Sequence, residues 1–260
     1  MQKKLPRVST KGYVLQGDKA QILLFHGYTG SPYDLKPLAI FLNNHGFAVH
    51  VPLLKGHGSH EDALKNITAK DWHRQARKEL AKLDPKRSVY IGGLSMGACL
   101  ALTHAKDLEA TRALLLISPA LSLKISAEIL ISAARLGFIP KDYLLPKLSG
   151  TSDIADPIAR AKCPSYANMP INGLLEFDTL RMRAREELPT IKLPIFMGFG
   201  RLDSVISISE CSNYILHSAQ LPVISQFYSR SKHVLTLDYD NEKLAYDILD
   251  FINNYEEPTV

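Results

Sequence analysis

A serine flanked by glycines is the feature of this sequence that most directly suggests chemistry. The segment from Gly93 to Gly97 reads G-L-S-M-G and lies between an apolar run that ends near residue 92 and a stretch of helical length that begins at Ala98. A strand that turns sharply into a helix crowds the residues two places before and after the bend, so both positions require glycine. Such a bend would hold Ser95 exposed and strained, as a nucleophile needs. A simple structural turn is the alternative interpretation.

A serine hydroxyl is a weak nucleophile near neutral pH, and it needs an imidazole as general base and a carboxylate to orient that imidazole. Asp203 follows an apolar run that begins at Pro194, and His233 follows another that ends at Tyr228. Ligands of an open α/β sheet collect at the carboxyl ends of its strands, where both side chains would then lie. The sequence therefore predicts a triad of Ser95, Asp203 and His233. A helix cap or turn is the alternative role for Asp203.

Stabilising the oxyanion of an acyl-transfer reaction requires two backbone N–H donors. One comes from the residue after the nucleophile, here Met96, and the second from the loop after an earlier strand. Residues 26–30, H-G-Y-T-G, follow the apolar run 21–25, and their glycines allow the backbone to approach a bound carbonyl. We therefore expect the Tyr28 N–H to be the second donor. His26 is expected to brace this loop through hydrogen bonds rather than to act as a base.

The other histidines are expected to have no catalytic role. His217 lies in the apparently helical stretch 208–219 rather than after a strand, which favours a surface or core role. The histidines at positions 45, 50, 60, 73 and 104 have no identifiable catalytic partner, and we expect them to be structural or solvated.

Apolar runs alternate with stretches of helical length around these residues. Runs suited to buried strands occupy residues 21–25, 47–51, 88–92, 113–117, 194–198 and 222–228. Helical stretches occupy residues 33–44, 72–83, 98–106 and 242–254. This alternation predicts βαβ units, and therefore an α/β fold with a mostly parallel sheet and helices on both faces. Residues 13–16 are expected to form a hairpin with 21–25, through a turn at Gly17 and Asp18.

One connection between these runs is unusually long. Ile117 and Pro194 are separated by 76 residues, whereas a crossover needs only about a dozen. The stretches 126–136 and 171–188 have an amphipathic pattern, so the insertion is predicted to be a helical excursion. Because α/β folds of this length are often built around one core, we expect residues 1–260 to form a single domain.

Composition excludes several classes of protein. The 260 residues are 46% hydrophobic and 22% charged, a balance typical of globular chains rather than disordered, fibrous or membrane-spanning ones. The formal charge is +5, but lysine and arginine are scattered among acidic residues, with no basic stripe and no RNA-binding motif. We expect a well-solvated surface and no nucleic-acid partner.

Cysteine usage and the N-terminus indicate a cytoplasmic protein. Cys99, Cys163 and Cys211 cannot all pair, and their wide spacing matches neither a disulfide framework nor a zinc site. The charged N-terminus is followed by no apolar segment of a leader peptide, and no run approaches the roughly 20 apolar residues of a membrane helix. No stable membrane insertion is therefore expected.

The chain resembles the α/β-hydrolase superfamily, and within it the small bacterial carboxylesterase and monoacylglycerol-lipase-like group. Beyond the glycine-flanked Ser95, the resemblance rests on the loop at residues 26–30, on a Gly-His-Gly loop at 56–58 and on the segments around Asp203 and His233. It spans nearly the whole chain. It implies the α/β-hydrolase fold, with a small helical cap inserted before the strand that carries the triad aspartate.

The resemblance also implies a role for the long insertion. Residues 121–188 would form the cap or lid over the active site. Its apolar residues could line an acyl or alcohol pocket, or could pack the cap against the sheet: Leu123, Ile125, Ile129, Leu136, Phe138, Leu174, Leu175, Phe177 and Leu180. Lys232 departs from the small residue that the group often has before its histidine. In the cleft Lys232 would favour anionic substrates, and in solvent it would have no effect.

The function predicted from these features is that of a serine carboxylic ester hydrolase. It would act through an acyl-enzyme on short- to medium-chain acyl esters, with monoacylglycerols among the candidate substrates, and would require no metal or organic cofactor. The same triad also serves thioesterases and other acyl hydrolases, which are the first alternative. A non-catalytic ligand-binding protein on the same scaffold is the second. The sequence does not determine the oligomeric state.

Overall fold

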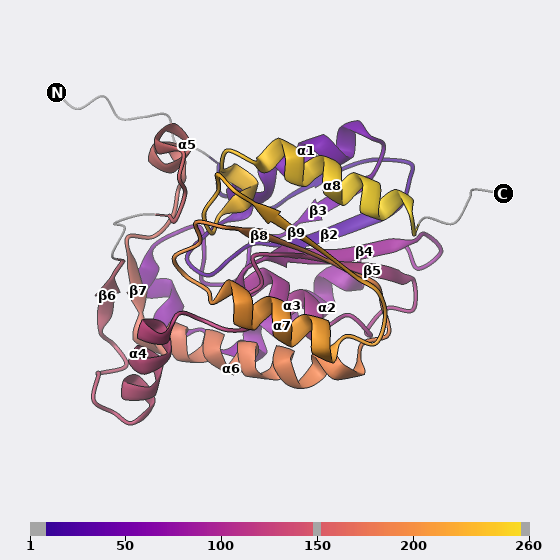
Figure 1. Cartoon of the computed structure of the whole chain (residues 1–260). Helices are drawn as coiled ribbons and strands as arrows, with labels where there is room; N and C mark the ends of the chain where they lie inside the picture. Colours follow the sequence, from indigo (N-terminus) through magenta and orange to yellow (C-terminus); the bar gives the residue numbers. More distant parts are fainter. Residues whose placement is uncertain (1–8, 148–151, 256–260) are drawn as a thin grey trace.

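A seven-stranded sheet forms the centre of the computed structural model, which describes residues 9–147 and 152–255 (Figure 1). The strand order is β1-β3-β2-β4-β5-β8-β9, and all neighbouring pairs are parallel except β1 with β3. The strands are β1 (Tyr13–Leu15), β2 (Gln21–Phe25), β3 (Ala48–Val51), β4 (Val89–Leu94), β5 (Thr111–Ile117), β8 (Ile195–Gly200) and β9 (Val223–Tyr228). Every residue of β2, β4 and β8 is buried, because helices cover both faces of the sheet. The predicted α/β class is confirmed.

Helices lie on the two faces of the sheet in separate layers (Figure 1). The helices α1 (Lys36–Asn44) and α8 (Asn241–Asn253) cover one face, and α2 (Ala69–Leu80), α3 (Met96–Thr103) and α7 (Ile208–Ser218) cover the other. Short 3-10 helices occupy Pro32–Leu35, Glu61–Asn66, Leu188–Thr190 and Leu235–Leu237. Each layer packs against the sheet around its own hydrophobic cluster, so both faces of the central strands are shielded from solvent.

The start of α2 shows how a local cap determines a boundary. The helix begins at Ala69, three residues before the predicted start, because Thr68 and Asp71 form a capping box. The Thr68 hydroxyl accepts from the Asp71 N–H, and the Asp71 carboxylate accepts from the Thr68 N–H at 3.1 Å. This arrangement satisfies two backbone donors that would otherwise have no partner at the helix end.

The hairpin expected at the N-terminal end of the sheet is not formed. β1 pairs antiparallel with β3, whereas β2 has β3 on one side and β4 on the other, both parallel to it. Both edges of β2 are therefore occupied, and β1 adds to the free edge of β3. Gly17 lies so close to the main chain of Phe47 that a Cβ atom would contact its carbonyl at 2.5 Å. The connection thus crosses the start of β3 before it enters β2, so β3 lies between β1 and β2 in the sheet.

The segment between β5 and β8, residues 118–194, is called the insert here. It contains α4 (Ile125–Arg135), β6 (Leu144–Pro146), α5 (Pro157–Lys162), β7 (Asn168–Pro170) and α6 (Ile171–Glu187). The two long helices correspond to the predicted ones, but the β6–β7 hairpin and α5 were not predicted from the sequence. Within the described residues, no helix has the length and apolar character that crossing a membrane requires.

The apolar residues predicted for the cap fall into two groups of four, and the ninth, Leu175, is partly buried against the first group. Leu123, Leu174, Phe177 and Leu180 are buried in the cluster on the α3 side of the sheet. Four side chains on and after α4 face solvent instead, with exposed fractions between 62% and 79%: Ile125, Ile129, Leu136 and Phe138. For these four, the expected packing against the sheet is wrong. Hydrophobic periodicity identifies an apolar helix face but not whether another element covers it.

Candidate active site

The bend between β4 and α3 has the strained geometry predicted for a nucleophile. Ser95 lies at the junction with φ 57° and ψ −114°, a conformation that costs a side chain of this kind about 1–3 kcal/mol. A Cβ at Gly97 would overlap the carbonyl oxygen of Phe25, and one at Gly93 would lie 2.5 Å from the carbonyl carbon of Gly97. Both glycines are therefore required by close backbone approach, and they hold the serine at the carboxyl end of a central strand.

Asp203 and His233 meet at the carboxyl ends of β8 and β9. Asp203 Oδ2 lies 2.7 Å from His233 Nδ1, and Asp203 Oδ1 accepts from the N–H groups of Val205 at 2.7 Å and Ile206 at 3.0 Å. Both side chains are almost completely buried. Because a carboxylate only accepts, the imidazole donates from Nδ1, which leaves Nε2 free to accept a proton.

The electrostatics of this pair favour the ion pair over the neutral form. Burial alone would lower the pKa of His233, but the charge of Asp203 and the hydrogen bond between the two residues raise it above the ordinary value. Burial alone would raise the pKa of Asp203, but His233 and the two backbone donors lower it. The imidazolium that forms when His233 accepts a proton is therefore stabilised by Asp203.

The loop at residues 26–30 lies directly beside Ser95. A Cβ built on Gly27 would lie 3.5 Å from the Cβ of Ser95. Within the described residues, the backbone N–H groups of Tyr28 and Met96 donate to no acceptor, as expected for groups reserved for a ligand. The two predicted oxyanion donors therefore flank the serine from two different segments of the chain.

Two buried histidines brace this loop. His26 Nε2 accepts from the Leu54 N–H at 3.0 Å, and burial lowers the pKa of His26 to about 4. His57 Nε2 accepts from the Thr29 N–H at 3.3 Å, and burial and the neighbouring His26 lower its pKa well below the ordinary value. Both rings thus stay neutral and act as hydrogen-bond acceptors for the main chain, which is the role expected for His26.

One contact of the predicted triad is not made. Among the described residues, Ser95 Oγ has no hydrogen bond with His233, although both lie at the same edge of the sheet. Catalytic hydrogen bonds are often long in unliganded enzymes and tighten when substrate binds. The structure thus brings Asp203 and His233 together and places Ser95 beside the loop at residues 26–30.

Lys232 takes neither of the two positions expected for it. Its Nζ lies 3.4 Å from Oδ1 of Asp153, a buried carboxylate in the insert, and its side chain is one-third exposed. The sequence contained no signal for Asp153, because this residue lies 50 positions before Asp203 in an irregular segment. Lys232 is therefore occupied by an ion pair with the insert.

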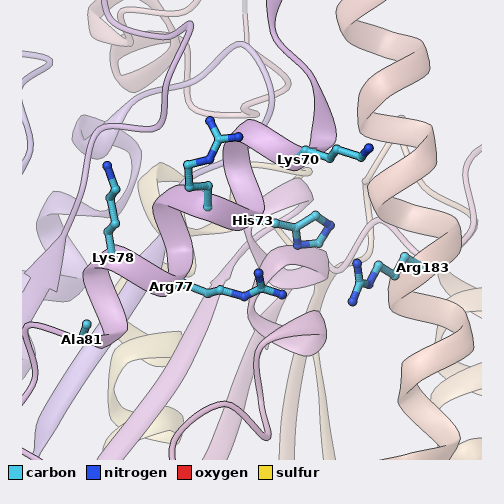
Figure 2. Close-up of a pocket in the computed structure, with 7 residues that line it drawn as sticks. Lys70, His73, Arg77, Lys78, Ala81 and Arg183 are labelled. Carbon is cyan, nitrogen blue, oxygen red and sulfur yellow. The ribbon is translucent and has the colours of Figure 1, made fainter.

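The remaining histidines lie away from this site, as expected. His217 is on α7, with Nδ1 2.6 Å from the Asn213 carbonyl. His73 and His104 contact each other at 3.0 Å beside a groove of about 500 Å³ between α2 and α6 (Figure 2). The expectation that basic residues form no stripe is wrong for α2, which presents four cations to this groove: Lys70, Arg74, Arg77 and Lys78.

Comparison with known proteins agrees with this geometry. The model of the family described as serine aminopeptidase, S33, matches residues 16–240, and the chain belongs to this family. The fold and the site define a serine hydrolase of the α/β-hydrolase superfamily.

Individual relatives are similar over nearly their whole length. A carboxylesterase from Bacillus subtilis (strain 168) is 24% identical over 96% of this chain and 98% of its own. A thermostable monoacylglycerol lipase from Bacillus sp. (strain H-257) is 27% identical over 88% of this chain and 89% of its own. A solved structure of a metagenome-derived lipolytic enzyme, from a study of LipS and LipT, has a TM-score of 0.82 and 26% identity, covering 95% of this chain and 98% of its own.

Proposed function

We propose that the protein hydrolyses carboxylic esters through a covalent acyl-enzyme, with Ser95 as nucleophile, His233 as general base and Asp203 as the residue that orients the imidazole. The observation that carries the proposal is the buried 2.7 Å contact between Asp203 and His233 at the sheet edge that also holds the strained Ser95. The names of the two Bacillus relatives support ester hydrolysis.

The reaction begins when Ser95 Oγ attacks the ester carbonyl carbon and transfers its proton to His233 Nε2. The oxyanion accepts hydrogen bonds from the N–H groups of Tyr28 and Met96 as the tetrahedral intermediate forms. His233 then gives the proton to the leaving alcohol, and the acyl group stays on Ser95. A water molecule repeats the sequence, releases the carboxylic acid and restores the serine. Asp203 stabilises the imidazolium in both halves.

The proposed substrates are short- to medium-chain acyl esters, with monoacylglycerols among them. The relatives named carboxylesterase and monoacylglycerol lipase support acyl esters and monoacylglycerols as substrates, and residues 121–188 are proposed to act as the lid that selects among chain lengths. An ester panel in which the acyl chain varies from about two to twelve carbons would measure the selection. A flat dependence of kcat/KM on chain length would contradict a selective lid.

Ser95→Ala tests the proposal directly. It should lower kcat on p-nitrophenyl butyrate by at least about 10⁴-fold and abolish labelling by a fluorophosphonate probe, because the proposed acyl-enzyme forms on the Ser95 hydroxyl. Ser118→Ala is a matched control, since Ser118 also has a positive φ, 43°, and lies at the end of the neighbouring strand β5. The control should keep its labelling. Activity of the Ser95 variant at the wild-type level would exclude the mechanism.

The same measurements separate the alternatives. A thioesterase would hydrolyse an acyl-CoA faster than a monoacylglycerol or p-nitrophenyl butyrate of equal chain length, measured side by side. Solved structures with this fold include a thioesterase domain of the curacin pathway at 18% identity and TM-score 0.65, so the fold alone does not choose between acyl chemistries. A ligand-binding protein would bind esters without being labelled at Ser95.

A further inference from the structure

A carboxylate of the insert contacts both loops that carry the acid and base. Asp153 is buried, and its Oδ2 accepts from the N–H of Ser204 at 3.0 Å and from the N–H of His233 at 3.3 Å. Its main-chain carbonyl accepts from the N–H of Val234 at 3.0 Å. One residue of the insert therefore holds the main chain next to Asp203 and the main chain of His233 itself.

A second carboxylate makes the reverse connection. Asp238, in the segment after His233, is fully buried and accepts from two N–H groups of the insert, those of Ala155 at 2.7 Å and Asp156 at 2.9 Å. It also accepts from the Lys232 N–H at 2.8 Å. Residues 153–156 and the histidine loop are thus joined by buried, charge-assisted hydrogen bonds in both directions, which are stronger than neutral ones.

The charges around His233 come from two segments, the β8 loop and the insert. Asp203 of the β8 loop and Asp153 of the insert are negative, and Lys147 of the insert is positive. Asp203 and Asp153 raise the pKa of His233, while Lys147 lowers it. Lys232 pairs with Asp153 on the side away from these backbone contacts, through Oδ1. Asp153 therefore acts on His233 both through a hydrogen bond to its main chain and through its charge.

We propose that Asp153 is a positioning residue for catalysis: by binding the N–H groups of Ser204 and His233 together, it fixes the base relative to Ser95 and couples the insert to the triad. This proposal rests on the proposed function. A loop displacement of about 1 Å can cost a hydrolase on the order of 100-fold in rate, so a contact that fixes the histidine loop has a measurable effect on kcat.

Three substitutions separate the effect of the hydrogen bonds that Asp153 accepts from the effect of its charge. Asp153→Ala removes both and should lower kcat about 10- to 100-fold, with KM within about threefold of wild type. Asp153→Asn keeps an oxygen acceptor but removes the charge, so it should move the acid limb of the kcat/KM profile to lower pH with a smaller loss of kcat. Lys232→Met leaves the Asp153 charge without its counter-ion and should move that limb to higher pH.

Asp178→Asn is the matched control, because Asp178 is also a buried carboxylate of the insert but pairs with Arg181 on α6. It should lower the thermal midpoint and leave the pH limb in place. If Asp153→Ala does not fold, the opposite shifts in Asp153→Asn and Lys232→Met still test the proposal. Wild-type kcat and an unmoved limb in Asp153→Asn, with an unmoved limb in Lys232→Met, would overturn it. Full activity of Ser95→Ala would instead overturn the proposed function.

A second, independent observation concerns the groove between α2 and α6. Its walls carry Lys70 and Arg77 from α2 and Arg183 from α6, and its lining contains no carboxylate from the part of the chain that the structure describes (Figure 2). Arg77 and Arg183 extend from the two helices toward His73, which lies between them (Figure 2). Two carboxylates outside the lining pair with its arginines: Asp107 lies 3.7 Å from Arg77 Nε, and Asp71 lies 3.4 Å from Arg74. Positive charges that gather around a concave surface raise the local concentration of anions.

The proton positions at the floor of the groove follow from a hydrogen-bonded chain. His104 Nδ1 lies 2.6 Å from Asp107 Oδ2 and must donate, so the neutral His104 accepts through Nε2 from His73 Nδ1 at 3.0 Å. His73 Nε2 is then an acceptor, without a partner among the described residues. Burial, His104 and the arginines lower the pKa of His73 to about 4, so the ring stays neutral at pH 7.

We infer that this groove binds hydrogen phosphate, with the anion between Arg77 and Arg183 and its P–OH group donating to His73 Nε2. Sulfate has the same shape and charge but no hydrogen to donate near neutral pH. A site that offers a buried acceptor discriminates against a ligand that leaves this acceptor unpaired.

Calorimetric titration with inorganic phosphate and with sulfate at equal ionic strength and pH 7.5 tests this inference. Phosphate should bind at least about tenfold more tightly, and Arg183→Ala should weaken its binding about tenfold or more. His73→Phe should remove the preference over sulfate. Lys82→Ala, an equal charge change outside the groove, should leave the affinity within about twofold. Equal binding of the two anions, or no binding of phosphate, would overturn the inference.

Discussion

Two histidines in this molecule each hold an aspartate at almost the same distance, yet their surroundings make them different groups. Asp203 lies 2.7 Å from Nδ1 of His233, and Asp107 lies 2.6 Å from Nδ1 of His104. The carboxylate of Asp203 is completely buried, whereas that of Asp107 is 36% exposed and also faces Arg77. The first histidine has a raised pKa and the second a lowered one.

A short distance between a histidine and an aspartate does not by itself make the histidine a base. Burial lowers the pKa of both rings. At His233, the buried carboxylate of Asp203 raises the pKa by more than burial lowers it, and the charge of Asp153 raises it further. At His104, solvent and the Arg77 guanidinium weaken the attraction of the Asp107 carboxylate for the imidazolium. The effect of burial is therefore the larger one, and it lowers the pKa of His104. Catalytic assignment must therefore consider what else each partner contacts.

The largest expected effect comes from removing each carboxylate in turn. Asp203→Asn should lower kcat on p-nitrophenyl butyrate about 10³- to 10⁴-fold, because the amide no longer holds the imidazole in the productive tautomer. Asp107→Asn should change kcat by less than about threefold. Similar losses in the two variants would show that the pairs are equivalent and that the assignment of the base is wrong.

The pH dependence of hydrolysis should identify which histidine is the base. Only a neutral His233 accepts the serine proton, so kcat/KM should fall about tenfold per pH unit below its pKa. Because this pKa is raised, the half-maximal point should lie above pH 6.5, the ordinary value for histidine. Replacing Asp107 by Asn should leave the profile unmoved. A half-maximal point below pH 6 would contradict the assigned base.

The smallest effect is on stability, and its sign differs between the two regions. The folded pKa of His73, about 4, lies below the unfolded value near 6.5, so its contribution is lost as pH falls through this window. His233 has a raised folded pKa, so its contribution is present below 6.5 and lost as pH rises. Urea midpoints at pH 7.5 and 5.0 should therefore differ less in His73→Gln than in wild type. An unchanged difference would argue against a neutral His73.

Much of the fold could be predicted because burial and sharp turns are local properties. The apolar runs of β2, β4 and β8 are buried on both faces, as continuous hydrophobic sequence requires. The pairing of β1 could not be predicted, because it depends on which strand edge β2 and its parallel neighbours leave free. The exposure of Ile125 and Phe138 could not be predicted either, because it depends on the absence of a covering element among the described residues.

The bend at Ser95 could be predicted from local sequence, since only glycine fits at Gly93 and Gly97, and the positions of Asp203 and His233 after apolar runs identified them as its partners. The surroundings of these three residues depend on how distant segments fold together. Asp153 reaches the histidine loop from 80 residues away, and Lys232 turns to that carboxylate. Local sequence carries steric and periodic information, but hydrogen bonds and charges act through space, and the distances that govern them exist only once the chain has folded.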